Sequence, residues 1–426
     1  MTSPRESRRA ERRYQLAIRR NLNRNFIVHL VHGMLGQTGF RLLNAPTFLP
    51  AYILLLSGSD LAVGAALALQ AFGTAITPLI GANLIEHRAR VLPIGFSTGG
   101  VMRLSILGIA VSGLWLPPHQ ALWAIYFWLA VFGLSQGMQG VIFNFLMSKV
   151  IPVSKRGRLT GLRNFLAGIA SAGVAVIGGE LFLGDQPTAA GYSYTFVMAF
   201  LLTAAGLAAL SFMREPEPPS VRPRTALLAR LGEMPALLRA DPAFTRYFIA
   251  RSLATAGRMA LPFYILYAGV SMQLTGSTLG VLTVAFTLAG TVSNLLWGNL
   301  ADRFGFRLVY LLTIGLWVVS TLLLMVTSGL LMTAVVFAAI GAAVQGFQNA
   351  SMNLTLEFGH RDDLPMRIAI ANTASELAGT LGPLAGGIIA HTLGYPTLFA
   401  ASVAFLLAGG VMVAWMVPEP RHRKTV

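Results

Sequence analysis

The chain has no cysteine and few charged residues. Among its 426 residues, 11% are charged, against about 25% in an average soluble domain. The absence of cysteine excludes disulfide bonds and thiol chemistry. The sequence also lacks metal-ligand spacings and the Gly-x-x-x-x-Gly-Lys loop that an ATP-driven pump needs. It therefore predicts neither an enzyme nor an ATPase, and we expect no metal and no cofactor.

Apolar residues dominate what is present. They make up 55% of the chain, and the mean hydropathy is +0.65. A membrane-spanning helix needs about 20 apolar residues. Apolar runs of about this length predict twelve spans, near residues 26–56, 61–84, 92–113, 121–148, 159–183, 194–213, 246–270, 278–300, 308–328, 330–355, 367–391 and 396–417.

The basic residues follow this layout. Lys and Arg are retained on the cytoplasmic side of short loops. All but five of the 32 basic residues lie in the tails and in alternate loops, which predicts an inner-membrane protein with both termini in the cytoplasm. The net charge of +16 is then explained by topology and by anionic lipid headgroups, so we expect the lipid bilayer, and no nucleic acid, as a partner. The exceptions, inside spans, are Arg41, Arg103, Arg163, Arg251 and Arg258.

Short motifs occur twice along the chain. Leu-Pro-x-Tyr at 49–52 recurs at 261–264, and Gln-Gly-x-Gln at 136–139 recurs at 345–348. Two similar apolar halves suit two bundles that move around a site held between them. The predicted domains are a basic tail (1–25), an N-terminal six-helix bundle (26–213), a central cytoplasmic loop (214–245), a C-terminal six-helix bundle (246–417) and a second tail (418–426).

A charged hinge separates two apolar runs in each half. It reads Gly-x-Leu-Ala-Asp-Arg-x-Gly-x-Arg at 298–307, with a weaker copy at 81–90. With the two six-span halves and the basic central loop, it resembles the major facilitator superfamily of transporters, over essentially the whole chain. The resemblance implies an all-α integral membrane fold, with twelve transmembrane helices in two pseudo-symmetric six-helix bundles.

The resemblance also implies a gating role for the hinge, as a latch made in one conformation and broken in the other. It assigns close helix packing to Gly298, an electrostatic contact with a helix end to Asp302, and anchoring of the loop to two arginines. A turn without any gating role is the alternative. The residues concerned are Gly298, Asp302, Arg303, Gly305 and Arg307, with Glu86 and Arg90 in the N-terminal copy.

A Gly-Pro-x-x-Gly-Gly element at 382–387 is similar to one found in antiporter branches of that family. There it usually lies in helix 5, whereas here its full form lies in helix 11. Small residues four apart also let helices pack closely, so a packing role is the alternative. Antiporters carry an arginine where this chain has Gly133, which leaves proton coupling through that position unsupported.

Polar side chains inside spans usually face a partner or a wet cavity. In the family, helices 1, 4, 7 and 10 line the cavity, so their polar residues are the candidates for binding a small polar solute. Bonds between helices are the alternative role. The candidates are Gln37, Arg41, Gln136, Gln139, Arg258, Gln345, Gln348 and Asn349.

Arg41 and Arg258 lie at comparable depth in the predicted helices 1 and 7. Two guanidinium groups facing one cavity would form an anion site. The arrangement is similar to that of the organophosphate antiporter branch, although the residue register differs. Internal neutralisation, for which Glu376 is the only carboxylate deep enough in a span, is the alternative.

Three titratable groups could carry a coupling proton: Glu376, His29 and His32. Structural roles for each are the alternative. Together these features predict a monomeric secondary active transporter that moves a small polar, anionic organic solute by alternating access, coupled to protons. A drug or metabolite exporter of the antiporter type is an alternative. A transporter-derived membrane receptor or assembly factor is an alternative of another class.

Overall fold

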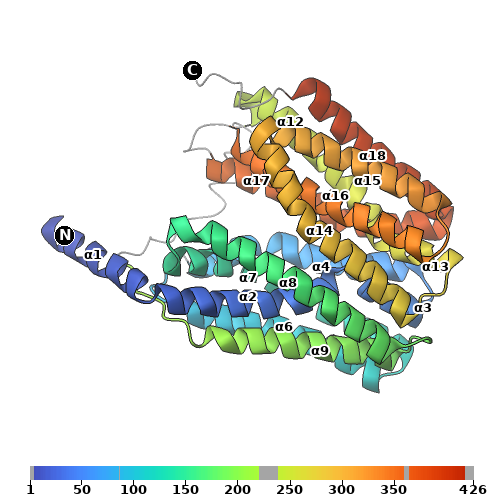
Figure 1. Ribbon diagram of the computed structural model, residues 1–426, viewed down its shortest axis with the longest axis horizontal. Helices are drawn as coiled ribbons and strands as arrows, with labels where there is room; N and C mark the ends of the chain where they lie inside the picture. Colours follow the sequence, from blue (N-terminus) through green and yellow to red (C-terminus); the bar gives the residue numbers. More distant parts are fainter. Residues whose placement is uncertain (1–3, 86, 220–237, 359–363, 418–426) are drawn as a thin grey trace.

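The helices form two bundles that lie side by side (Figure 1). The computed structural model describes residues 4–85, 87–219, 238–358 and 364–417. Residues 22–210 form the N-terminal bundle and residues 242–416 the C-terminal bundle, while α1 (Pro4–Arg20) projects from one end. We call this end, where α18 (Tyr395–Met416) also finishes, the terminal end. The opposite end, which carries the turns at Gly58, Gly184 and Gly394, is the loop end.

Nine helices of the described residues are long and apolar enough to cross a bilayer. Two of them are composite: α8 (Val153–Ile177) continues into the π-helix η1 (Gly178–Leu183), and α12 (Pro242–Ala256) continues through the 3-10 helix η2 (Gly257–Phe263) into α13 (Tyr264–Ser271). The others are α6 (Leu92–Trp115), α7 (Pro118–Val150), α9 (Ala189–Leu210), α14 (Gly276–Phe304), α15 (Phe306–Val326), α16 (Leu330–Leu356) and α18.

Three further apolar segments complete the predicted set. A tenth span is the pair α2 (Leu22–Asn44) and α3 (Phe48–Ser57), which meet at an angle of 41°. The shorter α4 (Asp60–Ile76) is followed after one residue by α5 (Pro78–Ile85). The last is α17 (Leu364–Leu393), which contains an apolar stretch at Leu377–Leu393. Each predicted span thus corresponds to one helix or one broken helix.

Prolines mark several of the breaks. Pro46 lies between α2 and α3, Pro78 begins α5, and Pro262 lies inside η2. Proline lacks the backbone N–H that a helix interior needs and clashes with the preceding turn, so it bends or ends the helix. Pro46 and Pro262 sit at the cavity described below, so the breaks turn backbone toward it.

The two bundles contact each other closely between mid-span and the loop end. A Cβ atom at Gly64 of α4 would lie 2.4 Å from the carbonyl oxygen of Pro383 in α17, and one at Gly276 would lie 1.9 Å from the carbonyl oxygen of Gly179. Only glycine allows backbones to approach this closely. The crossings therefore close the molecule at the loop end, while the bundles diverge toward the terminal end (Figure 1).

Hydrogen bonds between the bundles reinforce this closure. The Thr283 hydroxyl donates to Thr47 Oγ1 at 2.7 Å, and the Tyr395 hydroxyl donates to Asp60 Oδ1 at 2.7 Å. The second pair lies at the loop end, because Asp60 and Tyr395 begin their helices there, whereas Thr47 lies at the break between α2 and α3.

Candidate functional site

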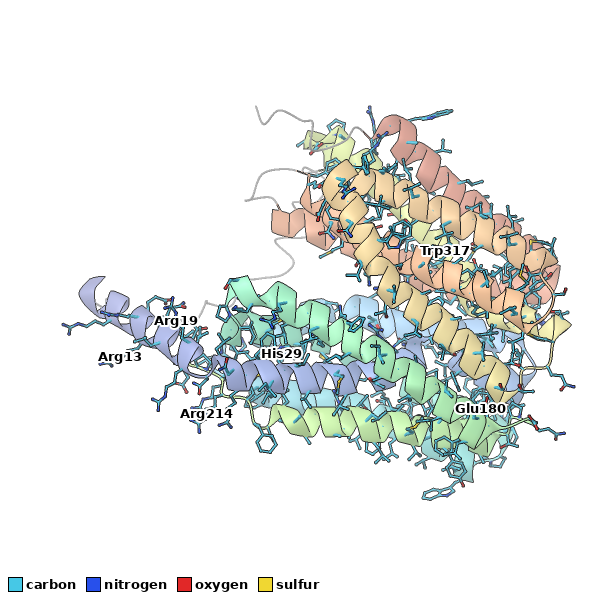
Figure 2. All side chains as sticks on the ribbon, viewed as in Figure 1. Arg13, Arg19, His29, Glu180, Arg214 and Trp317 are labelled. Atoms are coloured by element: carbon cyan, nitrogen blue, oxygen red, sulfur yellow. The ribbon has the colours of Figure 1, made fainter. Side chains whose placement is uncertain are left out.

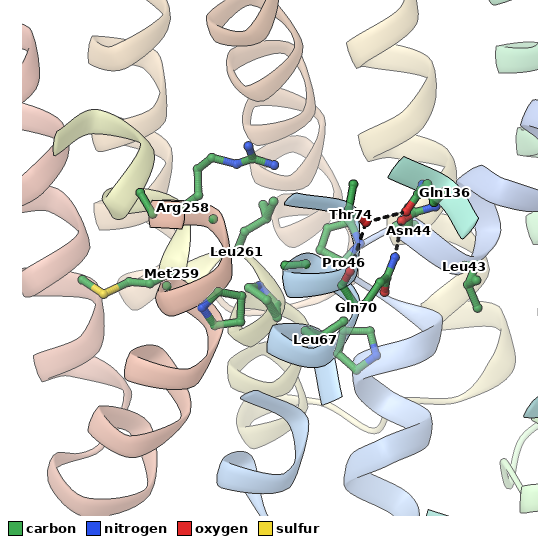
Figure 3. Close-up of a pocket in the computed structure, with 18 residues that line it drawn as sticks. Leu43, Asn44, Pro46, Leu67, Gln70, Thr74, Gln136, Arg258, Met259 and Leu261 are labelled. Atoms are coloured by element: carbon green, nitrogen blue, oxygen red, sulfur yellow. Dashed lines mark hydrogen bonds between the residues drawn. The ribbon is translucent and has the colours of Figure 1, made fainter. Parts of the chain in front are cut away.

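A cavity of about 350 Å³ lies between the bundles, beside the α4–α17 crossing. Its N-terminal wall comes from α2, α4 and α7, and its C-terminal wall from η2 and α17. Figure 3 shows Arg258 reaching in from one side and a cluster of polar residues facing it from the other. That cluster consists of Asn44, Gln70, Thr74 and Gln136.

Hydrogen bonds hold the cluster in place. The Gln70 amide donates to Asn44 Oδ1 at 2.7 Å, and the Thr74 hydroxyl lies 3.3 Å from Gln136 Oε1 (Figure 3). The Gln70 side chain is nearly buried, with 8% exposed. Fixed carboxamides present both donors and acceptors to a ligand without adding charge.

A second cavity of about 200 Å³ adjoins the first and shares Asn44 and Ala45 with it. Arg41 and Asn164 form its N-terminal wall, and Thr291 and Gln345 belong to its C-terminal wall. The Arg41 guanidinium spans the boundary between the bundles, donating to Thr291 Oγ1 at 3.0 Å and to the Asn164 carbonyl oxygen at 3.3 Å. A longer bond of 3.5 Å reaches Gln37 Oε1.

The two cavities share an unusual electrostatic feature. Their described lining contains two arginines and no aspartate or glutamate. Among the described residues, the hydrogen-bond partners of Arg41 are an amide, a hydroxyl and a carbonyl, all of them neutral. A buried charge needs a partner of opposite sign to offset the loss of water. The lining is therefore suited to a ligand that brings negative charge.

The structure places the predicted solute ligands in three groups. Gln136 and Arg258 line the first cavity, whereas Arg41 and Gln345 line the second. The two arginines thus lie in adjoining cavities and not across a single one. A third group, in a separate chamber inside the N-terminal bundle, consists of Gln37 and Gln139, with Gln136 at its border.

The candidate residues of α16, the tenth predicted span, lie in different environments although they repeat a motif of the N-terminal half. Asn349 donates to Asn294 Oδ1 at 2.5 Å, and Asn294 lines the second cavity. Gln348 is exposed and lines none of the three cavities. Recurrence in the two halves therefore does not place Gln348 in the same environment as Gln139.

Sequence reasoning missed polar residues on three other helices. Gln70 of α4, Asn164 of α8 and Thr291 and Asn294 of α14 all line the cavities. The family resemblance indicates helices 1, 4, 7 and 10 as the lining, and these residues belong to other helices. A polar residue inside any apolar span was the available signal, and it applies to all four.

The candidate proton carriers are separated by the structure. His29 and His32 are buried beside each other against Phe143, with ring centroids 4.4 Å and 5.1 Å from it. Nδ1 of His32 lies 2.8 Å from the Gly206 carbonyl oxygen, while neither ring nitrogen of His29 has a partner among the described residues. The side chain of Glu376 lies outside the described residues.

The C-terminal hinge lies where α14 meets α15. Gly305 has a φ of 90°, which favours glycine, and it ends α14 and begins α15. Arg307 donates to the carbonyl oxygens of Val413 at 3.4 Å and Ala414 at 2.5 Å, in the last turn of α18. One expectation is not met, because a Cβ atom at Gly298 would meet nothing within 4 Å. Gly298 therefore does not permit a close helix contact in this conformation.

The remaining hinge residues stand at the ends of their helices. Asp302 and Arg303 occupy the last turn of α14. In the N-terminal copy, Arg90 forms an exposed salt bridge of 2.7 Å with Glu217, while Glu86 lies outside the described residues.

A different acid caps the neighbouring helix in the N-terminal half. Glu215 accepts hydrogen bonds of 2.8 Å from the backbone N–H groups of Val91 and Leu92, where α6 begins, and forms a buried ion pair with Lys149. Carboxylates are stabilised at helix N-termini by the unpaired N–H groups and the helix dipole. The segment after α9 therefore ties the loop before α6 to the end of α7.

Comparison with known proteins agrees with this architecture. Solved structures with similar folds include a mutant of the nucleoside transporter NupG, with a TM-score of 0.74, 10% identity and 92% of this chain and 99% of that chain covered. An auto-inhibited POT family peptide transporter has a TM-score of 0.68, 12% identity and coverage of 95% and 98%. At these identities the likeness shows the fold alone.

Sequence comparison gives the family. An uncharacterized MFS-type transporter of Mycobacterium tuberculosis is 30% identical over 142 residues, which are 33% of this chain and 24% of that protein. The match thus spans about a quarter of the relative's length. The sequence profile of the Major Facilitator Superfamily matches residues 30–265 and 247–426. The chain therefore belongs to the Major Facilitator Superfamily, and its long apolar helices are those of a multi-pass membrane protein.

Proposed function

We propose that this protein is a secondary active transporter that moves a small organic anion across the inner membrane by alternating access. The observation that carries the proposal is the pair of adjoining cavities between the bundles, lined by Arg41 and Arg258 and, in their described parts, by no acidic residue. Guanidinium groups bind carboxylates and phosphates through paired N–H groups. The solute therefore carries at least one such group.

The surrounding amides define the rest of the solute. Asn44 and Gln136 supply neutral donors and acceptors to the larger cavity, and its wall also includes Leu67, Met259 and Leu261. Such a mixed wall suits a ligand with polar groups on a partly apolar frame. The two walls of each cavity belong to different bundles. Movement of one bundle against the other therefore opens the site to one side of the membrane and then to the other.

We assign the terminal end to the cytoplasm. Arg13, Arg19 and Arg214 gather at this end in Figure 2, as the positive-inside rule requires of a cytoplasmic face. With the loop end closed by glycine crossings, this conformation is the one that faces inward. In this assignment the C-terminal hinge lies in a cytoplasmic loop, and we propose that Asp302, Arg303 and Arg307 latch the bundles in the opposite, outward-facing conformation.

We propose protons as the coupling ion. His29 and His32 are titratable groups within the N-terminal bundle, and Glu376 belongs to α17, whose residues Gly382 and Pro383 line the larger cavity. A proton taken up at either place would change the charge of one of the two bundles that hold the anion between them, and this would couple proton movement to solute movement.

A second candidate function is export of drugs or metabolites by antiport. It is favoured by the position of Gly382 and Pro383, which belong to the antiporter-like element and line the larger cavity. The two functions differ in the ligand, because an exporter of lipophilic cations would not depend on Arg41 or Arg258. A receptor or assembly factor built on this fold would move no solute at all.

The test is ligand-induced thermal stabilisation of the purified protein across a panel of organic anions, neutral polar solutes and lipophilic cations, followed by flux in proteoliposomes. Replacing Arg41 or Arg258 with Lys keeps the charge but loses the planar guanidinium group with its paired N–H donors. This should weaken anion binding by about 1 to 3 kcal/mol. Replacement with Gln should abolish it.

Arg251→Gln is the matched control, because Arg251 is buried in the C-terminal bundle, donates to Thr355 Oγ1 at 2.9 Å and lines none of the three cavities. Anion binding should survive in this variant. If cations or neutral solutes instead stabilise the wild type and the Arg41 and Arg258 variants equally, the result favours the exporter. Absence of flux for every stabilising ligand would favour a receptor.

A further inference from the structure

A chamber of about 210 Å³ lies inside the N-terminal bundle, between α2, α6, α7 and α8. It is separate from the cavities between the bundles and meets the larger one only at Gln136. Two arginines, Arg103 and Arg163, line it together with His32. Its described lining contains no aspartate or glutamate, so positive charge is enclosed here without a negative partner.

The hydrogen bonds of the two arginines leave donors unused. Nε and Nη2 of Arg163 both lie 3.4 Å from one acceptor, Oδ1 of Asn164, and its Nη1 has no hydrogen-bond partner among the described residues. Arg103 donates from Nε to the Thr203 carbonyl oxygen at 3.0 Å and from Nη1 to the Gly99 carbonyl oxygen at 2.8 Å, which leaves Nη2. Both arginines are nearly buried, with 3% of Arg103 and 9% of Arg163 exposed.

Each of the two guanidinium groups lies over the face of a phenylalanine ring. Arg103 lies over the ring of Phe40, at 5.2 Å, and Arg163 lies over the ring of Phe143, at 5.4 Å. Both rings line the chamber. An aromatic face stabilises a cation without accepting a conventional hydrogen bond, so the N–H groups of the guanidinium keep their capacity to bind other acceptors.

Asn164 connects Arg163 of the chamber with Arg41 of the second cavity between the bundles. Its amide oxygen accepts from Arg163 and, at 3.2 Å, from Gln37, while its carbonyl oxygen accepts from Arg41. One neutral residue thus serves two arginines. Amide oxygens offset only part of the loss of hydration of two buried cations, whereas an anion would offset it directly.

We propose that the chamber is an oxyanion-binding site, in which the guanidinium groups of Arg163 and Arg103 hold a carboxylate, phosphate or sulfate group. The site is additional to the central cavities and does not depend on the proposed transport of an organic anion through them. The oxyanion has two sources, a free inorganic ion or the acidic group of the solute reaching past Gln136, and both use the same donors.

The experiment measures binding of radiolabelled sulfate to the purified full-length protein by equilibrium dialysis, with chloride at equal ionic strength as competitor. Arg163→Gln should lower the affinity for sulfate by about ten- to a hundred-fold, the range for a charge-assisted hydrogen bond. Arg163→Lys should recover only part of it. Arg251→Gln, which removes an equally buried arginine outside the chamber, should bind sulfate as the wild type does.

A second variant fills the chamber without removing charge. Gly140 lines it, and a Cβ atom there would meet nothing within 4 Å. Gly140→Leu should therefore fold, since leucine also favours the helix, and should exclude sulfate. Competition by a transported organic anion identifies the solute's acidic group as the occupant, whereas simultaneous binding identifies a separate inorganic ion.

Sulfate binding that persists in both Arg163→Gln and Gly140→Leu would overturn the proposal, as would a wild-type protein that binds sulfate no better than chloride. Failure of the proposed function gives a different result. In that case Arg41→Gln and Arg258→Gln transport every solute as the wild type does, while the Arg163 and Gly140 variants still lose sulfate.

Discussion

Two ion pairs of the N-terminal bundle differ sharply in environment. The side chains of Lys149 and Glu215 are 5% and 4% exposed, whereas those of Arg90 and Glu217 are 68% and 57% exposed. Glu215 also accepts the backbone N–H groups at the start of α6. An exposed pair contributes little to stability, while removal of one member of a buried pair leaves an uncompensated charge.

Glu215→Gln should therefore destabilise the protein by about 3 to 5 kcal/mol. Glu217→Gln, the matched control on the same segment, should change stability by no more than about 1 kcal/mol. Chemical unfolding of both variants in mixed micelles measures the difference. Equal effects of the two substitutions would mean that water reaches Lys149 and Glu215 in the membrane-bound protein.

At the level of the helices, the break between α14 and α15 is linked directly to α18. Gly305 turns the chain at φ 90°, and Arg307 then donates to the last turn of α18. Cations are stabilised at helix C-termini by the carbonyl groups left unpaired there. The hinge thus joins three helices of the C-terminal bundle at the terminal end.

Asp302→Asn removes the acidic charge of this hinge while keeping its shape. If the hinge acts as a latch in the outward-facing conformation, the variant should fold and insert normally but shift the balance between conformations by about 1 to 2 kcal/mol, a factor of about 5 to 30. Transport kinetics at matched expression measure this shift. Kinetics identical to those of the wild type would show that the hinge is a structural turn without a gating role.

At the scale of the whole molecule, the all-α membrane fold was predicted from the sequence, and the described helices are consistent with twelve spans: nine are of spanning length, a bent pair makes a tenth, and two apolar helices are shorter. Bilayer thickness fixes the length of an apolar run, so a local pattern is enough to find each span. The lengths of the apolar runs do not indicate the breaks at Pro46 and Pro262, which divide two of the predicted spans. Arg41 and Arg258, which the sequence predicts in one cavity, line two adjoining ones.

The site was harder to predict because it depends on how helices rotate about their axes. Gln70 and Asn164 belong to helices that are expected to pack and not to line a cavity, yet both reach one. Gln348 repeats Gln139 in sequence but is exposed. Packing between helices decides these orientations, and a single sequence does not encode them locally.

The proposed topology has a direct test, made simple by the absence of native cysteine. Cysteines introduced at Ser59, Gln186 and Gln273 lie at the loop end and should react with an impermeant thiol reagent added outside intact cells. A cysteine at Arg158, an exposed position at the terminal end, should react only after the membrane is opened. Labelling of position 158 in intact cells would reverse the orientation.

Asn164 stands between Arg163, Gln37 and Arg41, and its place there has an evolutionary consequence. Codons for asparagine and aspartate differ by one base, so a single mutation can give the bundle a permanent internal counter-ion at this position. Such a descendant would be more stable without any ligand, and for the same reason would bind anions poorly. The neutral amide of Asn164 thus leaves the positive charge of Arg163 and Arg41 available to an anion.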